Sequence, residues 1–193
     1  MEKYSIVFVM DKSGSMLNMG DEPWQSLNSF VKEQKSQNSN FTFTLCFFND
    51  VTEFKYENIK SNEIIPLTGA DYNPSGMTAL YDAIGKTIEF QKEKTPNNKV
   101  IFVILTDGQE NCSKEYNQFT IKTLISYMEE KYNWEFVFLA NKLGLEEAKK
   151  CGIKNSCEFE YTPCGFNNIM SSVSSQVSKT ICGFNSVENK KLT

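Results

Sequence analysis

Apolar segments of strand length alternate with segments of helical periodicity along the chain. Residues 4–10, 99–106 and 135–140 are nearly continuous runs of β-branched, aliphatic and aromatic side chains, which is typical of strands covered on both faces. Residues 24–35 and 119–132 place apolar side chains three and four positions apart, which predicts helices with one buried face. Because helices that alternate with strands connect parallel strands, the pattern predicts a parallel sheet.

The other segments add shorter elements. Asn49 and Asp50 separate two aromatic and branched runs, residues 41–48 and 51–59, and predict a two-residue hairpin turn with one antiparallel strand. We expect the aromatic side chains of the first run to lie in the core. The remaining predictions are helices at 78–93 and 144–151, a strand at 157–161 and a serine-rich surface helix at 167–182.

These elements predict one doubly wound, Rossmann-like α/β domain. Its six-stranded, mostly parallel sheet has the strand order 3-2-1-4-5-6, with strand 3 antiparallel at the edge and helices on both faces. A length of 193 residues suits one domain, which we expect to span residues 1–184, with residues 185–193 as a C-terminal tail. In this order strands 1 and 4 are neighbours, and ligands bind at the carboxyl ends of strands beside such a switch point.

Oxygen-bearing side chains follow both strands at this switch point. Strand 1 runs into Asp11, Ser13 and Ser15, strand 4 is followed by Asp107, and a third polar loop ends at Thr78. Carboxylates and hydroxyls are hard donors that suit Mg²⁺, Mn²⁺ or Ca²⁺. The sequence therefore predicts a divalent-cation site formed by these residues. Each also fits a local role, the aspartates and the threonine as helix caps and the serines as turn residues.

Composition narrows the possible chemistry. The chain has no histidine, and all 20 of its basic residues are lysine. This excludes histidine-dependent catalytic triads, histidine-ligated zinc and arginine fingers. A net charge of −4 argues against nucleic acid or an anionic membrane as a partner. No apolar run is long enough for a transmembrane helix, so we expect no membrane association.

The cysteines and the N-terminus bear on the cellular compartment. The six cysteines form no Cys-x-x-Cys pair, and the first residues lack the features of a signal peptide. We therefore expect a cytoplasmic protein with free, buried thiols. Cys151, Cys157 and Cys164 are close enough in sequence to leave a disulfide as the alternative.

Three segments resemble the metal-binding motifs of von Willebrand factor type A domains. Residues 11–15, Asp-Lys-Ser-Gly-Ser, resemble the Asp-x-Ser-x-Ser signature of the metal-ion-dependent adhesion site. Residues 76–83 are similar to the threonine loop of that family, and residues 105–111 to its Thr-Asp-Gly segment. The motifs occur in the family order, residues 136–141 resemble the next strand of small bacterial and phage-type members, and the resemblance covers roughly residues 3–182.

The resemblance implies a function as well as a fold. Ser13, Ser15 and Thr78 would bind Mg²⁺ directly or nearly so, and Asp11 and Asp107 would act directly or through water. A protein partner would supply an Asp or Glu carboxylate to the ion, so the chain would be a cation-dependent protein-interaction module and not an enzyme.

Two alternatives remain open at this stage. One is a metal-dependent phosphoesterase or nuclease, a class whose sites usually gather three or more acids. Asp71 and Asp82 are the candidate extra acids, although we expect Asp82 to make local hydrogen bonds and Lys12 to be solvated. The other is a structural domain in which the cation only neutralises two aspartates that otherwise repel each other.

Overall fold

A single six-stranded sheet forms the centre of the molecule. The computed structural model describes residues 4–37 and 40–189. The strand order is β3-β2-β1-β4-β5-β6. Only the edge strand β3 is antiparallel to its neighbour, so the predicted topology is confirmed. The strands are β1 (Tyr4–Asp11), β2 (Phe41–Phe48), β3 (Thr52–Lys60), β4 (Lys99–Thr106), β5 (Glu135–Ala140) and β6 (Ser156–Glu158).

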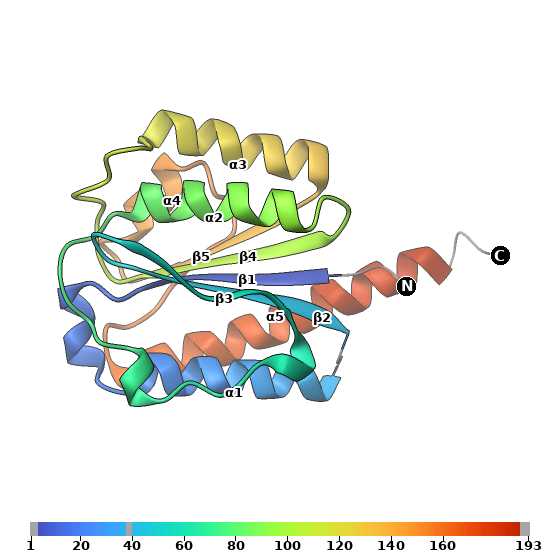
Figure 1. Cartoon of the computed structure of the whole chain (residues 1–193), viewed down its shortest axis with the longest axis horizontal. Coiled ribbons are helices and arrows are strands. Elements are labelled where there is room, and N and C mark those ends of the chain that lie inside the picture. Colours follow the sequence, from blue (N-terminus) through green and yellow to red (C-terminus); the bar gives the residue numbers. More distant parts are fainter. Residues whose placement is uncertain (1–3, 38–39, 190–193) are drawn as a thin grey trace.

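Helices cover both faces of the sheet, as the sequence predicts (Figure 1). On one face lie α1 (Glu22–Gln37) and α5 (Pro163–Asn189), and on the other lie α2 (Leu80–Lys94), α3 (Gln118–Tyr132) and α4 (Leu145–Lys150). Short 3-10 helices occupy Gly14–Met19, Ser61–Glu63 and Gly69–Asp71. No described helix combines the length and the apolar character needed to cross a membrane.

The buried strands explain why the apolar runs are continuous. Every residue of β1 is buried. Ile6 and Phe8 belong to the core cluster shared with α1 and α5, whereas Val7 and Val9 belong to the cluster shared with α2 and α3. Because successive side chains of a strand point to opposite faces, a strand covered on both sides needs apolar residues at every position. The aromatic residues expected in the core are buried there: Phe41, Phe43, Phe47 and Phe48.

The last helix differs from its prediction at both ends. It begins at Pro163 and ends at Asn189, whereas the sequence predicts residues 167–182, and residues 190–193 lie outside the described residues. Proline is favoured in the first helical turn. One face of this helix is buried against the core, and Gln34 of α1 donates to Ser174 Oγ at 2.8 Å. The buried apolar side chains of α5 recur at helical spacing: Phe166, Ile169, Met170, Val173, Val177 and Ile181.

The hairpin between β2 and β3 also differs from its prediction. Three residues, 49–51, connect the strands instead of two. The Asn49 side chain accepts a hydrogen bond from the Val51 amide at 3.0 Å, and the Asn49 amide donates to the Val51 carbonyl at 3.2 Å. These bonds close the turn one residue later than the Asn-Asp pair predicts, because asparagine side chains bond to the backbone two residues on.

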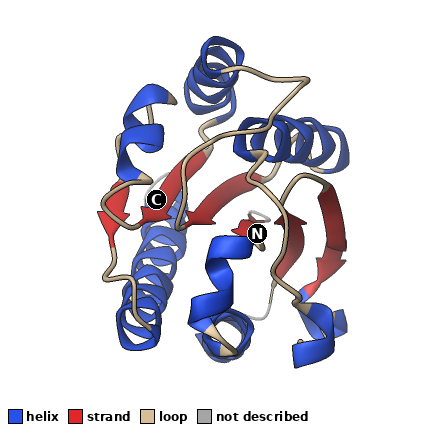
Figure 2. Ribbon diagram, turned by 90° about the vertical axis from the view of Figure 1, so that its left-hand side faces the viewer, coloured by secondary structure: helices blue, strands red, loops and turns tan. Residues whose placement is uncertain are grey.

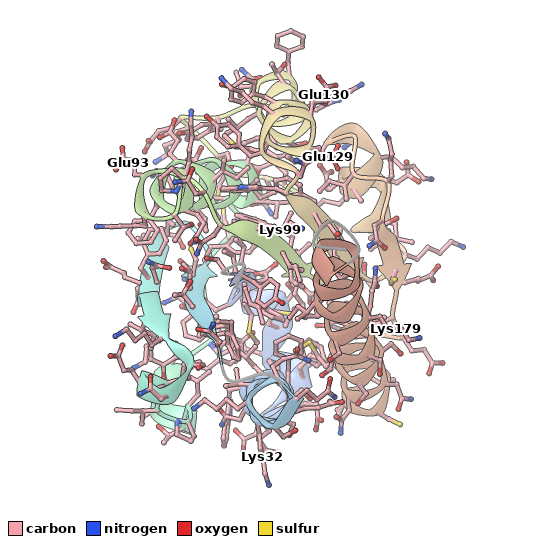
Figure 3. All side chains as sticks on the ribbon, turned by 90° about the vertical axis from the view of Figure 1, so that its right-hand side faces the viewer. Lys32, Glu93, Lys99, Glu129, Glu130 and Lys179 are labelled. Atoms are coloured by element: carbon pink, nitrogen blue, oxygen red, sulfur yellow. The ribbon has the colours of Figure 1, made fainter. Side chains whose placement is uncertain are left out.

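The two ends of the strands differ in character. Charged side chains lie at the amino edge, among them Glu93 of α2, Lys99 of β4 and Lys179 of α5 (Figure 3). The opposite, carboxyl edge carries the loops that follow β1, β2, β4 and β5 (Figure 2). The predicted ligands lie on this second edge.

Candidate metal centre

Three loops bring the five predicted ligands to the carboxyl ends of β1 and β4. Asp11 is the last residue of β1, and Ser13 and Ser15 follow it. Asp107 comes directly after β4, and Thr78 lies two residues before α2. Because β1 and β4 are paired in parallel up to Met10 and Leu105, one residue before each strand ends, the segments that follow them leave the sheet side by side.

Hydrogen bonds join four of these residues in one group. Ser15 Oγ donates to Asp107 Oδ1 at 2.7 Å, and Ser13 Oγ lies 3.0 Å from Ser15 Oγ. Asp11 Oδ1 accepts from the Ser13 amide at 2.7 Å, and its Oδ2 accepts from Thr106 Oγ1 at 2.6 Å. The carboxylate–hydroxyl cluster expected from the sequence is therefore present as a set of contacts.

Thr78 presents its hydroxyl to the same place. A Cβ built on Gly108 would lie 3.7 Å from Thr78 Oγ1 and 3.9 Å from Ser15 Oγ. The Thr78 amide donates to Asn111 Oδ1 at 2.9 Å, and the Thr78 carbonyl accepts from the Asn111 amide at 3.0 Å. Asn111 thus fixes the backbone of Thr78 and leaves its hydroxyl toward Ser15 and Gly108.

A capping role for Thr78 is wrong. Helix α2 starts at Leu80, not at residue 78, and its cap position is Ala79, which has no polar side chain. Within the part of the chain that the structure describes, the Thr78 hydroxyl has no hydrogen-bond partner. The side chain is nevertheless buried. The hydroxyl oxygen of Thr78 is therefore available to coordinate a cation.

The electrostatics of the site suit a cation. Asp11 is fully buried, and this burial, aided by the nearby charge of Asp107, raises the pKa of Asp11 to about 6 against the opposing hydrogen bonds of Thr106 and Ser13. Among the described residues neither Asp11 nor Asp107 forms an ion pair. Lys12, expected to be solvated, instead pairs with Glu53. Two carboxylates without a balancing cation favour a positive ligand.

The donor set fits a hard divalent ion. It comprises carboxylate and hydroxyl oxygens alone, which suit Mg²⁺, Mn²⁺ or Ca²⁺. In the described residues no three Asp, Glu, His or Cys side chains gather in a way that could hold a metal. A site here would therefore depend on its three hydroxyls as much as on its two carboxylates.

Three side chains that hold the site in place were missed by sequence reasoning. Tyr72 donates to the Asp11 carbonyl at 2.5 Å, Asn141 Nδ2 donates to the Asp107 carbonyl at 2.5 Å, and Tyr161 donates to the Ser15 carbonyl. Burial, followed by the neighbouring Asp107 carboxylate, raises the pKa of Tyr161 to about 12, which keeps its hydroxyl a donor. No sequence signal could have revealed these contacts, because each joins a side chain to the backbone of a remote segment.

Two acidic residues attach the loop after β4 to the start of α2. Glu110 accepts from the Tyr81 amide at 2.9 Å and from the Ser113 amide at 2.7 Å. Asp82 accepts from the amides of residues 114, 115 and 116 at 2.8 to 2.9 Å. The expectation of local hydrogen bonds for Asp82 is wrong, because its partners lie more than thirty residues away. These bonds set where Thr78 lies relative to Asp107.

A glycine sets the approach of the loop that carries Thr78. Gly76 has φ +77°, and its carbonyl accepts from the Gly14 amide at 3.1 Å. We expect Gly76→Ala to lower the free energy of unfolding by about 1–2 kcal/mol, because an L-residue is strained at this φ. The added Cβ would also meet Asp50 Oδ1 at 2.0 Å.

Urea unfolding of Gly76→Ala measures this cost, with Gly69→Ala as the control. Gly69 lies in the same connection, does not have a positive φ, and has no atom closer than 3.9 Å to an added Cβ. Equal stability of the two variants would contradict the role given to Gly76.

Comparison with known proteins identifies the family. Residues 5–156 match the von Willebrand factor type A domain, so the chain belongs to this family. Its members are typically protein-interaction modules and usually non-catalytic. No curated protein sequence matches the chain.

Solved structures with the same fold include three of different origin. Proximal thread matrix protein 1 from the mussel byssus has a TM-score of 0.64 at 18% identity over 92% of this chain and 46% of its own. The pilus adhesin SpaC from Lactobacillus rhamnosus GG, in its open conformation, has a TM-score of 0.68 at 12% identity, over 93% of this chain and 30% of its own. Manganese-loaded TRAP protein from Plasmodium vivax has a TM-score of 0.63 at 13% identity, over 88% of this chain and 71% of its own. At these identities the likeness shows the fold alone, and the chain spans less than half of the first two proteins.

Proposed function

We propose that the chain is a divalent-cation-dependent protein-interaction module whose metal-ion-dependent adhesion site is intact. The carrying observation is the contact group of Ser13, Ser15 and Asp107, with the unbonded Thr78 hydroxyl facing it. A protein partner supplies an Asp or Glu carboxylate to the ion. The residues that would hold Mg²⁺, or Mn²⁺ or Ca²⁺, are Asp11, Ser13, Ser15, Thr78 and Asp107.

The chemistry of the donor set supports this role. A bound ion supplies positive charge at the crevice and accepts oxygen ligands. Three of the five protein donors are neutral hydroxyls, so the protein does not surround the ion with negative charge. The Asp11 carboxylate accepts from the Ser13 amide and Thr106 Oγ1, and the Asp107 carboxylate accepts from Ser15 Oγ, so both carboxylates are already oriented. The TRAP protein of Plasmodium vivax, which has the same fold, was solved in a manganese-loaded form, and this adds support.

We further propose that the module is non-catalytic. The acids that a metal-dependent phosphoesterase would recruit are engaged elsewhere. Asp71 is paired with Lys55 at 2.6 Å and accepts from the Thr68 amide at 2.7 Å. The Asp82 carboxylate accepts hydrogen bonds from three backbone amides. Neither carboxylate contacts the group formed by Ser13, Ser15 and Asp107.

The proposed compartment is a reducing one, such as the cytoplasm. All cysteines whose side chains the structure describes are free thiols, which supports this proposal over the disulfide alternative. Burial raises the pKa of Cys46 and of Cys151 to about 12, so these two thiols are unreactive.

Selection of peptides by the protein tests the function directly. The immobilised chain is exposed to a displayed library of random cyclic peptides in Mg²⁺, and bound peptides are eluted with EDTA. The proposal expects the eluted peptides to share an Asp or Glu whose exchange for Asn or Gln abolishes binding. A purely metal-stabilised structural domain would yield no peptides that EDTA releases.

Thr78→Ala separates a ligand role from a structural one. We expect it to weaken the Mg²⁺-dependent binding of a selected peptide about tenfold, which corresponds to about 1.4 kcal/mol. The free energy of unfolding should fall by no more than about 1 kcal/mol, the cost of losing one buried methyl group, because the hydroxyl has no hydrogen bond to lose among the described residues.

Fluorescence polarisation and urea unfolding provide the two readouts for Thr78→Ala. Thr123→Ala, an exposed threonine of α3, is the matched control. A loss of about 1 kcal/mol in stability with unchanged peptide binding would mean that Thr78 serves the fold and not the ligand.

A further inference from the structure

Exposed apolar side chains are concentrated around the candidate metal centre. The described residues include seven large hydrophobic side chains that are exposed. Four of them lie on the connections between strands and helices at the carboxyl edge that carries the predicted ligands. They are Leu17 (62% exposed), Val51 (62%), Met77 (56%) and Leu143 (63%), and we call them the apolar rim.

Three members of the apolar rim follow or precede site residues closely. Leu17 is two positions after Ser15 in the same 3-10 helix. Met77 directly precedes Thr78. Leu143 is two positions after Asn141, whose side chain donates to the Asp107 carbonyl and accepts from the Leu143 amide at 3.0 Å. Each of these side chains therefore belongs to a segment that also positions a predicted ligand.

The fourth member, Val51, lies in the β2–β3 turn, which is hydrogen-bonded to the loop that carries Thr78. The Asn49 carbonyl in this turn accepts from the Ala79 amide at 2.7 Å, and Asn49 Nδ2 donates to the Ser75 carbonyl at 2.9 Å. The turn is thus bonded to the loop of Thr78 on both sides of that residue. In the sheet order, β2 and β5 flank β1 and β4, so Val51 and Leu143 lie on opposite sides of the site.

The charges beside the apolar rim are balanced. Exposed Asp50 adjoins Val51, exposed Lys142 adjoins Leu143, and Lys12 is paired with Glu53. This surface has no excess of cations that would attract a strongly acidic segment. The charge that the site can complement is one carboxylate at the ion, and the large exposed apolar side chains on these connections are those of the apolar rim.

Resting on the proposed function, we infer that the partner presents a single Asp or Glu flanked by large aliphatic or aromatic side chains, which contact the apolar rim while the carboxylate reaches the ion. Apolar side chains around a polar contact exclude water from it and strengthen it. Their burial adds affinity roughly in proportion to the apolar area removed from water.

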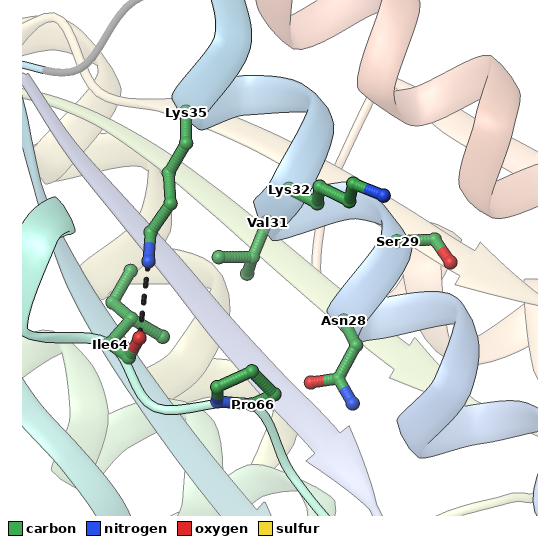
Figure 4. Close-up of a pocket in the computed structure, with 7 residues that line it drawn as sticks. All are labelled: Asn28, Ser29, Val31, Lys32, Lys35, Ile64 and Pro66. Carbon is green, nitrogen blue, oxygen red and sulfur yellow. Dashed lines mark hydrogen bonds between the residues drawn. The ribbon is translucent and has the colours of Figure 1, made fainter.

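A second groove does not compete for this partner. It has a volume of about 330 Å³ between α1 and residues 64–66, and Lys35 Nζ donates to the Ile64 carbonyl across it (Figure 4). None of the five predicted ligands lines it. Ile65 beside this groove is 72% exposed, which makes it a matched control for the apolar rim.

The test reads the sequences of EDTA-released peptides and compares two double variants. We expect large apolar residues beside the shared acid to be enriched severalfold over the unselected library. Met77→Ser/Leu143→Ser should weaken a selected peptide about tenfold or more, with Mn²⁺ affinity unchanged within about twofold. Ile65→Ser/Phe119→Ser, which alters two exposed apolar residues outside the rim, should bind the peptide as the wild type does.

The outcomes separate this inference from the proposed function. Acidic peptides without flanking apolar enrichment, or equal binding by both double variants, would overturn the apolar contact and leave the cation-dependent function standing. Failure to recover any EDTA-released peptide from a protein that binds Mn²⁺ would overturn both. Loss of Mn²⁺ affinity in Met77→Ser/Leu143→Ser would show that these side chains support the site instead of contacting a partner.

Discussion

Asp11→Ala is expected to weaken Mn²⁺ and Mg²⁺ binding at least about a hundredfold. Asp11 is fully buried at the end of β1, and its two carboxylate oxygens accept from the Ser13 amide and from Thr106 Oγ1. Its removal deletes one of the two negative charges of the candidate site. It also removes the hydrogen bond that holds the Ser13 amide in place. Titration followed by the electron paramagnetic resonance of free Mn²⁺ measures the affinity.

Two further variants keep this prediction decisive. Asp11→Ala also leaves a buried amide and a buried hydroxyl without an acceptor, which costs about 1–3 kcal/mol each. Ser15→Ala is therefore tested in parallel, because Ser15 is exposed and its loss should weaken ion binding without unfolding the chain. Asp50→Ala removes an exposed aspartate from the same edge and should leave the affinity unchanged. Wild-type Mn²⁺ binding by both Asp11→Ala and Ser15→Ala would refute the assignment of the site.

Asp82→Asn is expected to lower the free energy of unfolding by about 3 kcal/mol. Three backbone amides, those of residues 114–116, donate to the buried Asp82 carboxylate. An asparagine would turn an NH₂ group toward N–H donors, so at least one amide would lose its acceptor. Urea unfolding at neutral pH measures the effect, and Glu93→Gln, at an exposed carboxylate of α2, is the control.

The pH dependence of Asp82→Asn has a definite sign. Burial alone would raise the pKa of Asp82, and the three amides together outweigh burial and lower that pKa. A lowered pKa contributes stability that is present above the ordinary value of ~4 and lost as the pH falls through the lowered value. The difference between wild type and Asp82→Asn should therefore shrink in acid. A difference that is constant down to about pH 2, or no difference at neutral pH, would contradict the role of the carboxylate.

The sequence predicted the fold closely where burial dictates residue type. The bounds of β4 and β5 match the prediction residue for residue, because strands covered on both faces require unbroken apolar runs. The start of α2 was predicted two residues early, because threonine is a favoured cap, whereas the structure caps this helix by means of Glu110 from another loop. Such contacts between remote segments outweigh local preference and leave no local pattern.

The candidate site divides along the same line. The proximity of the candidate donors could be predicted, since Asp11 and Asp107 follow two strands that the topology makes neighbours. The supports could not, since Tyr72, Tyr161 and Asn141 reach the site from other loops and bond to carbonyl groups that every residue has. Candidate donor residues can thus be predicted from a sequence, whereas the side chains that orient them depend on tertiary structure.

The sheet order also sets when an ion could first bind during folding. The residues that end β1 and β4 are far apart in the sequence and become neighbours only when these two strands pair in the sheet. The candidate ligands are therefore not brought together in the unfolded chain or in any local hairpin. They come together only through long-range parallel strand pairing, which is a slow step in folding. A cation would bind only late in folding. It would therefore mainly slow the unfolding of this domain and have little effect on the rate of folding.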